Sequence, residues 1–501
     1  MRTRALRTRL ADVQANIDQH RRALEVLEME KLGIEHELRQ TAAFDIHDLP
    51  VELTTQIFML LLPESLRTSR EAEVARPDPD DDDEWSSPRE VEYASNGHGR
   101  QISAPLLVMK VCRQWREIAL ATPALWATFM VDISQHLTVS DVCERFEEWV
   151  ERAQNFPLSV GVCGKTWGGD PEDIHILFEM LARFSPKIRH LELHLAHEDW
   201  EELGIYEWHL PQLQSLVAAC DSVPSVDGIA TRAFYNAPML RRVKLRSLLP
   251  AFQPATIFSN PMTAPTNLIP THITELTGVQ YTIATSLSAL LYLPNLIHAH
   301  FNGYNPVNFA VQGVQTPLRH EKLQYLKLTD DIGILQYLNL PNLDTLELDI
   351  RTKSYSMRLL ATVVLGRIRR FVLHMDPNFN ISATAYIRYL ATTFELVVNH
   401  PSAKTLTRIL DNYMRDVGFL PVLKQLSVRW SEITVETGEL ITRCVAAAVD
   451  AVGGKRLESL SIAFDHPSDT SKLGDGLLRL RGLKGSGVHA CMTIQGEPIT
   501  L

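Results

Sequence analysis

The sequence has no pair of cysteines at C-x-x-C spacing, the arrangement used by redox motifs and by many structural zinc sites. Its six cysteines are scattered over the chain: Cys112, Cys143, Cys163, Cys220, Cys444 and Cys491. A disulfide framework is typical of short secreted chains with dense cysteines, so this distribution favours free thiols in a reducing compartment. We therefore expect a cytoplasmic and/or nuclear protein.

Long apolar runs are also missing. A membrane-spanning helix needs roughly 20 consecutive apolar residues, whereas the densest run here is IFMLLL at 57–62. The first ten residues, MRTRALRTRL, carry four arginines and look superficially like a transit peptide. Transit peptides are poor in acid, but acidic residues follow here within the same helical pattern: Asp12, Asp18, Glu25, Glu28 and Glu30. We expect neither a membrane segment nor an import signal.

Positive charge is in deficit, because 49 lysines and arginines stand against 60 aspartates and glutamates, for a formal net charge of −11. Proteins that bind nucleic acid or anionic membranes usually carry a basic surface, so we expect neither as a partner. Part of the acidic excess lies in DPDDDDE at 78–84. The surrounding residues 65–103 are rich in Pro, Asp, Glu, Ser and Gly, a composition that predicts a disordered loop.

Catalytic and cofactor motifs are incomplete where they occur. The tripeptide GKT at 164–166 matches the end of a phosphate-binding loop, but Ser159 stands where that motif needs its first glycine. His190, His194 and His197 have a spacing that would align on a helix. Their segment instead has the pattern of a strand, on which His197 would face away from the other two. We expect no cofactor, no metal, no catalytic residue and no enzymatic activity.

Residues 7–40 predict one amphipathic helix with a seven-residue repeat, interrupted only by Gly33. The residues at its a and d positions are Leu10, Val13, Ile17, His20, Leu24, Leu27, Lys31, Ile34 and Leu38. Self-association as a coiled coil is one interpretation of this pattern. The other is a helix that folds back on its own domain or is only marginally stable.

Two further segments predict helices on either side of the acidic loop. In FDIHDLPVELTTQIFMLLLPE (44–64), a helix begins at Asp48 or at the Leu-Pro pair that follows it. Its predicted apolar face is widened by Phe58 and comprises Leu53, Ile57, Leu60 and Leu61. In APLLVMKVCRQWREIALATPALWATF (104–129), the pattern predicts one helix that ends at Thr122-Pro123 and a short turn at Leu125-Trp126.

From about residue 155 the template apolar-x-x-apolar-x-apolar recurs along the chain. Clear copies begin at Ile188, Leu240, Leu323, Leu343, Ile368, Leu423 and Leu457, and weaker copies begin at Leu213, Ile273 and Leu296. Spacings of 20 (323 to 343), 25 (343 to 368) and 27 (213 to 240) residues lie in the range of leucine-rich repeats. Helical patterns separate the copies, so each unit reads as a strand and a helix that cannot bury its apolar face without its neighbours.

The two segments around the acidic loop resemble an F-box. LPVELTTQIF has its opening Leu-Pro-x-Glu-Leu-x-x-x-Ile-Phe, and VMKVCRQWREIALATPALWATF has its Val-Cys-x-x-Trp followed by Leu-Trp. The residues that match are Leu49, Pro50, Glu52, Leu53, Ile57, Phe58, Val111, Cys112, Trp115, Leu125 and Trp126. The resemblance covers roughly 50 of the 501 residues. The N-terminal helix and the degenerate leucine repeats extend it loosely to fungal F-box proteins.

This resemblance implies a fold and a function. Known F-boxes are small three-helix units that bind a Skp-type adaptor of an SCF cullin–RING ubiquitin ligase, so the matching residues would contact the adaptor or form the core behind it. We expect an α/β repeat protein: an N-terminal helix or coiled coil (1–43), an F-box (44–130) interrupted by the loop, and an irregular leucine-rich-repeat arc or solenoid (131–501).

Two functions compete at this stage. In the first, the F-box binds the adaptor and the repeats bind an unknown protein substrate for ubiquitin-dependent degradation. In the second, the chain is a non-catalytic scaffold that assembles through its coiled coil. The sequence does not single out a substrate-binding surface on the repeats; the loops after the strands are the candidates.

Overall fold

The computed structural model describes residues 2–41, 49–62, 104–132, 139–163, 171–195, 197–220, 234, 237–247, 272–303, 317–329, 332–350, 364–365, 368–375, 387, 390–449, 457–466, 473, 475–483, 486–495 and 497–499. The predicted loop at 65–103 lies outside these residues. The chain divides into two compact units, Met1–Arg67 with Ala72–Trp126, and Thr68–Glu71 with Ala127–Leu501. No helix in the described ranges is long and apolar enough to cross a membrane.

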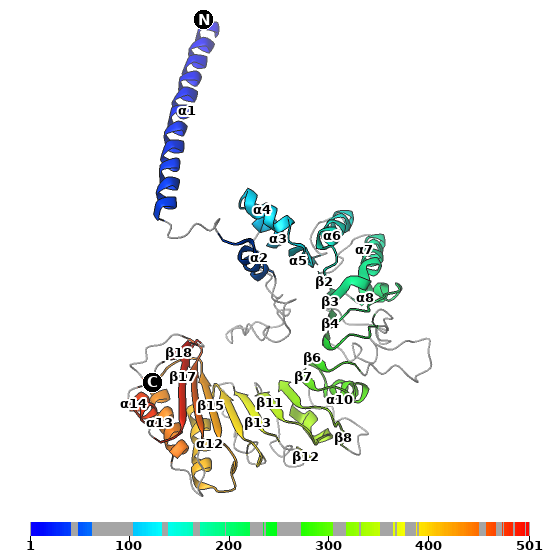
Figure 1. Ribbon diagram of the computed structural model, residues 1–501, viewed down its shortest axis with the longest axis vertical. Helices are drawn as coiled ribbons and strands as arrows, with labels where there is room; N and C mark the ends of the chain where they lie inside the picture. Colours follow the sequence, from blue (N-terminus) through cyan, green and yellow to red (C-terminus); the bar gives the residue numbers. More distant parts are fainter. Residues whose placement is uncertain are drawn as a thin grey trace. The chain divides into compact units, whose positions relative to one another are not determined.

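The first unit is helical (Figure 1). Its elements are α1 (Arg2–Thr41), α2 (Val51–Leu60), α3 (Ala104–Val108), α4 (Arg113–Leu120) and α5 (Pro123–Trp126). The long N-terminal helix predicted from the heptad pattern is therefore present as α1. The four short helices α2 to α5 contact one another.

The second unit is an α/β arrangement built on a large sheet. Among the described residues this sheet has 15 strands, and their order in space follows their order along the chain. The first seven are β1 (Thr128–Asp132), β2 (Leu158–Cys163), β3 (Ile188–Leu195), β4 (Ser215–Cys220), β5 (Arg242–Ser247), β6 (Glu275–Tyr281) and β7 (His298–Gly303). The other eight are β9 (Tyr325–Thr329), β11 (Thr345–Ile350), β13 (Arg370–Met375), β14 (Glu395–Asn399), β15 (Gln425–Trp430), β16 (Ser459–Phe464), β17 (His489–Ile494) and β18 (Glu497–Ile499).

Every pairing in this sheet is parallel except the last, between β17 and β18. Parallel strands need a connection that crosses back over the sheet, usually a helix. The described connecting helices are α6 (Val139–Ala153), α7 (Pro171–Phe184), α8 (His197–Leu203), α10 (Ile283–Tyr292), α12 (Ala403–Arg415), α13 (Val435–Val449) and α14 (Asp475–Gly482). Of two 3-10 helices, η3 (Ser185–Lys187) follows α7 in the same connection, and η4 (Ile332–Tyr337) lies between β9 and β11. The predicted α/β repeat-like arrangement is present in this coarse sense.

The apolar template explains where the strands form. Leu326, Leu346 and Phe371 are the middle residues of three template copies, and they are direct register partners on β9, β11 and β13. All three are fully buried. Because the second and third apolar residues of each template are two positions apart, they lie on the same strand face, and stacking the copies in register builds one continuous buried row. Burying a Leu side chain stabilises the folded chain by roughly 1.5–3 kcal/mol, so this row is the core of the unit.

Side chains at the helix starts fit these boundaries. Ser402 accepts a hydrogen bond from the Thr405 amide at the start of α12 (3.3 Å), and Thr282 accepts one from the Thr285 amide at the start of α10 (3.2 Å). Such N-caps satisfy backbone amides that have no partner within the helix. Helix α7 begins at Pro171, and proline suits the first turn of a helix because its missing amide hydrogen has no partner there in any case.

The last edge of the sheet is closed by an antiparallel strand. β18 pairs with β17, and its central residue is Pro498, opposite Thr493. Proline has no amide hydrogen and cannot donate to a further strand, so it limits edge-to-edge pairing. A separate three-stranded parallel sheet is formed by β8 (Leu318–Arg319), β10 (Leu338–Leu340) and β12 (Val364–Leu365), with β10 in the middle.

Candidate functional site: an apolar surface on short helices

Helix α2 begins directly after Pro50, whose carbonyl accepts the amides of Leu53 (3.0 Å) and Thr54 (3.1 Å). The structure buries Thr54 and Phe58 on this helix. The predicted apolar face, from Leu53 to Leu61, is exposed instead. Thr54 tolerates burial because its hydroxyl donates to the Pro50 carbonyl at 3.3 Å.

The prediction of one continuous helix from residue 105 to Thr122 is wrong, because the helix is interrupted between α3 and α4. Cys112 at the break has an extended backbone (φ −156°, ψ 173°), and its sulfur accepts the Trp115 amide at 3.4 Å. Cys112 is thus the N-cap of α4. Arg116 Nε donates to the Met109 carbonyl at 3.1 Å and ties α4 to the turn before it. The predicted turn at Leu125-Trp126 is the short helix α5.

Large aromatic and aliphatic side chains form the core behind these helices. Phe58 of α2 meets Trp115 of α4 edge to face, with ring centroids 5.0 Å apart. Trp126 of α5 is fully buried, and its Nε1 donates to the Ala119 carbonyl at 2.8 Å. Leu125 is also fully buried. The motif residues Phe58, Leu125 and Trp126 are core residues, and Trp115 is partly covered by its contact with Phe58.

Other motif residues lie on the outside. Val111 lies in the turn before α4. It is one of eight exposed leucine, isoleucine and valine residues on α2 to α4 and the turns between them, a set that we call the α2–α4 apolar surface. Its members are between 42% and 73% exposed: Val51, Leu53, Ile57, Leu60, Leu61, Leu107, Val111 and Leu120. Soluble proteins rarely expose so many large apolar groups within a few short helices unless another molecule covers them.

The remaining predicted residues flank this surface. Pro50 and Glu52 are exposed, and Leu49 and Cys112 are half-buried. Arg113 and Glu117 pair at 2.9 Å on the outer side of α4, where both side chains are well exposed. The described part of this unit therefore combines an aromatic core with exposed apolar residues and an exposed ion pair on α4. No protein-family model matches this chain. No curated protein matches it either.

The second unit carries a polar cluster that sequence reasoning missed. Glu347 on β11 receives Lys327 Nζ of β9 (3.0 Å) and His374 Nε2 of β13 (2.8 Å) on one carboxylate oxygen. Its other oxygen accepts the hydroxyl of Tyr325 at 2.7 Å. Asn399 Nδ2 of β14 lies 3.1 Å from Nδ1 of His374 and extends the cluster to a fourth strand.

Electrostatics hold the Glu347 carboxylate in its charged form. Burial alone would raise the pKa of Glu347, but hydrogen bonds from His374 and Tyr325 and the charge of Lys327 outweigh it and lower the pKa to about 2. The side chains of Lys327 and Glu347 are only 7% and 12% exposed. The cluster is thus a charged network in a mostly dehydrated place, which makes it rigid rather than chemically reactive.

The three histidines of this segment do not lie on one strand. His190 and His194 lie on β3 as predicted, whereas His197 begins α8 and is not part of the strand. His194 Nε2 lies 2.9 Å from Glu192, and burial together with the charges of Arg189 and Arg242 lowers the pKa of His190 to about 4. No group of three or more possible ligands for a metal occurs among the described residues. The GKT tripeptide at 164–166 lies outside the described residues.

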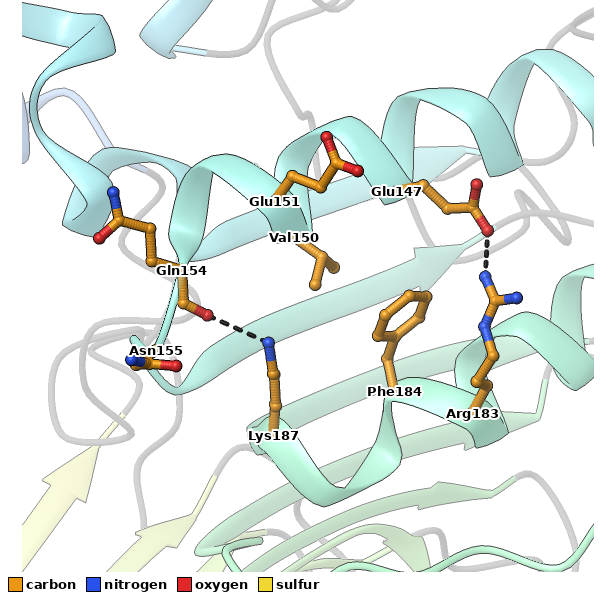
Figure 2. Close-up of a pocket in the computed structure, with 8 residues that line it drawn as sticks. All are labelled: Glu147, Val150, Glu151, Gln154, Asn155, Arg183, Phe184 and Lys187. Atoms are coloured by element: carbon orange, nitrogen blue, oxygen red, sulfur yellow. Dashed lines mark hydrogen bonds and ion pairs between the residues drawn. The ribbon is translucent and has the colours of Figure 1, made fainter.

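A surface hollow of about 520 Å³ lies between α6 and α7 (Figure 2). Figure 2 shows two cations from the α7 side reaching α6: Arg183 pairs with Glu147, and Lys187 Nζ donates to the Gln154 carbonyl at 3.1 Å. Arg183 also lies over the ring of Phe184, 4.7 Å from its centroid. Arg183 and Lys187 therefore link the α7 side of the hollow to α6 and to Gln154, the residue that follows α6.

Proposed function

We propose that this protein is a substrate-recognition subunit of an SCF-type cullin–RING ubiquitin ligase. The single observation that supports this most is the α2–α4 apolar surface. Three of its eight residues, Leu53, Ile57 and Val111, are among those that resemble an F-box, and the matching residues Phe58 and Trp126 are buried. In this proposal the outer residues bind a Skp-type adaptor and the inner ones hold the helices in place.

The physical case rests on the cost of leaving this surface in water. Transferring apolar area out of water is worth about 25 cal/mol per Å², and eight side chains of the α2–α4 apolar surface are more than two-fifths exposed. A partner with a complementary apolar groove would gain this energy on binding. The protein would do no chemistry itself, because holding a target near a ubiquitin-carrying enzyme raises the effective concentration of the two.

The α/β unit would bind the target, as a leucine-rich-repeat arc. Its strand face opposite the buried leucine row carries varied polar residues, such as the cluster around Glu347, so neighbouring positions can differ in chemistry without disturbing the core. Lys327 and Glu347 are largely buried, so they would order this face rather than contact the target, and the more exposed His374 (28%) would be available for contact. This face, in addition to the loops after the strands, is the candidate for target binding.

Co-expression with a Skp-type adaptor tests adaptor binding. Leu53→Glu places a charge on the apolar surface at a side chain that is 46% exposed, so the helices should still fold. Leu291→Glu is the matched control, since Leu291 is an exposed leucine (69%) on α10 of the other unit. We expect the native chain and the Leu291→Glu variant to co-elute with the adaptor and the Leu53→Glu variant to elute alone.

Failure of the folded native chain to bind any Skp-type adaptor would refute the proposal. Equal binding by the Leu53→Glu variant would show that the adaptor uses a different surface. Only the first of these outcomes favours the scaffold alternative. It is favoured by α1, a long helix with exposed apolar residues, and it requires that deleting 1–43 abolish assembly while Leu53→Glu leaves it intact.

A further inference from the structure

Helix α1 carries an apolar seam that the proposed function does not use. The helix has 40 residues, and every one of its side chains that the structure describes is exposed. The described apolar residues at its a and d positions are 41% to 69% exposed: Leu10, Val13, Ile17, Leu24, Leu27 and Ile34. A seven-residue repeat of this length is stabilised by packing against another helix rather than by helix propensity alone.

We propose that α1 pairs with α1 of a second copy of this chain as an antiparallel coiled coil, in the register in which the numbers of facing residues add up to 51. The inference does not depend on adaptor binding. It rests on two polar residues in the seam and on the charges that flank it.

The polar seam residues decide the orientation. His20 occupies a d position and Lys31 an a position. In a parallel dimer in register, each residue meets its own copy, so Lys31 would face Lys31 inside the seam. Two like charges there repel each other and lose hydration. In an antiparallel dimer, a positions lie level with d positions, so Lys31 can face the His20 ring of the second copy instead.

The apolar seam residues decide the register. In the proposed register Lys31 faces His20, Ile17 faces Ile34, and Leu24 faces Leu27. The polar residues share one layer, and each of these apolar residues meets another. The pairing extends from Leu10 to Thr41, the last residue of α1. Sliding the helices by one heptad would place Lys31 opposite Val13 and His20 opposite Leu24, which buries polar groups against apolar partners at a cost.

The flanking charges fit the same arrangement. Arg21 and Glu28 both occupy e positions, which face each other across an antiparallel seam. In the proposed register they lie two residues apart along the axis, about 3 Å, and the symmetry makes this attractive contact twice. On the other flank, Glu30 at a g position lies across from Ala23, which carries no charge.

Cross-linking tests the orientation in the full-length chain. We would prepare Ile17→Cys and Ile34→Cys chains, mix them, treat them with a short thiol-reactive cross-linker and identify the linked peptides by mass spectrometry. We expect a 17–34 link in the mixture, beyond the links that the native cysteines give in the unmodified chain. The Ile17→Cys chain alone should give no 17–17 link, because the two copies of residue 17 would be about 25 Å apart. A 17–17 link would establish a parallel pair and overturn the proposal, as would the absence of any link within α1.

A charge exchange tests the register. Arg21→Glu alone, or Glu28→Arg alone, turns both attractive contacts into repulsive ones, and we expect each variant to dimerise about tenfold more weakly in sedimentation experiments. Mixing the two variants restores opposite charges at both contacts, so the mixture should form heterodimers with the native affinity. Weakening without recovery in the mixture would contradict the register.

A matched pair of substitutions separates the seam from the rest of the helix. Leu27 and Met29 are similarly exposed (63% and 70%), but only Leu27 lies in the seam. Leu27→Glu should abolish dimerisation, whereas Met29→Glu should not. A monomeric native chain, or equal effects of the two variants, would overturn the proposal.

Discussion

The charged cluster on β9, β11 and β13 predicts a specific stability cost for Glu347→Gln. Glutamine keeps the shape and one acceptor but removes the negative charge, which leaves the nearly buried Lys327 without its counter-charge. Two estimates of the cost agree. The lowered pKa of Glu347, from 4.5 to about 2, corresponds to about 3 kcal/mol of stabilisation, and breaking a buried ion pair costs about 3–5 kcal/mol.

Hydrogen–deuterium exchange of the strands that carry the cluster measures this cost locally. A local measurement is preferable because repeat arrays do not always unfold as one cooperative unit. We expect peptides that contain β9 and β11 to open more readily in the Glu347→Gln variant, by about 3 kcal/mol at neutral pH. The Lys327→Met/Glu347→Gln double variant should recover much of the loss, because no buried charge is left alone. A double variant as unstable as the single one would refute the reasoning.

The same cluster predicts a pH dependence. Because the pKa of Glu347 is lower in the folded chain than its ordinary value of 4.5, its stabilising contribution is fully present above pH 4.5. It is lost as the pH falls from 4.5 towards 2, where the folded carboxylate takes up its proton. Other carboxyl groups titrate in the native and Glu347→Gln chains alike. The difference between the two melting temperatures should therefore shrink over this window.

Two glycines predict opposite outcomes. A Cβ added at Gly438 on α13 would lie 2.8 Å from the carbonyl oxygen of Leu473, so Gly438→Ala should destabilise the packing of α13 on α14 by about 1–3 kcal/mol, measured as faster exchange of α14. A Cβ added at Gly33 on α1 meets nothing within 4 Å. Gly33→Ala should therefore stabilise α1 by about 1 kcal/mol, measured as a higher melting temperature in circular dichroism.

The strands of the α/β unit could be predicted where the apolar template is complete. All seven clear copies and all three weaker ones coincide with strands β3 to β7, β9, β11, β13, β15 and β16. Strand β14 was not predicted, because Thr393 stands where its template needs an apolar residue. The structure buries Thr393 completely in that place. A threonine fits the shape of the position, but a pattern of apolar residues cannot identify it.

The sequence predicts which residues of α2 are apolar, but not which of them are buried and which are exposed. Spacing alone groups Leu53, Ile57, Leu60 and Leu61 with Phe58 on one apolar face and does not say which part of that face is covered. The structure buries the narrower face with Phe58, because Trp115 and the other short helices lie on that side. Which of two neighbouring faces is covered depends on contacts with residues more than 50 positions away, which no local pattern contains.

Charge pairs between neighbouring strands help to set the register of the sheet, in addition to the buried leucine row. Lys327 and Glu347 are direct register partners on β9 and β11, and their charged atoms are 3.0 Å apart. Arg370 is likewise the register partner of Glu395, from β13 to β14, at 3.4 Å. The buried leucine row alone would tolerate a slip of two residues, because it would still place apolar residues on the core side. Such a slip would separate both charge pairs, so the polar face fixes the register that the apolar face leaves open.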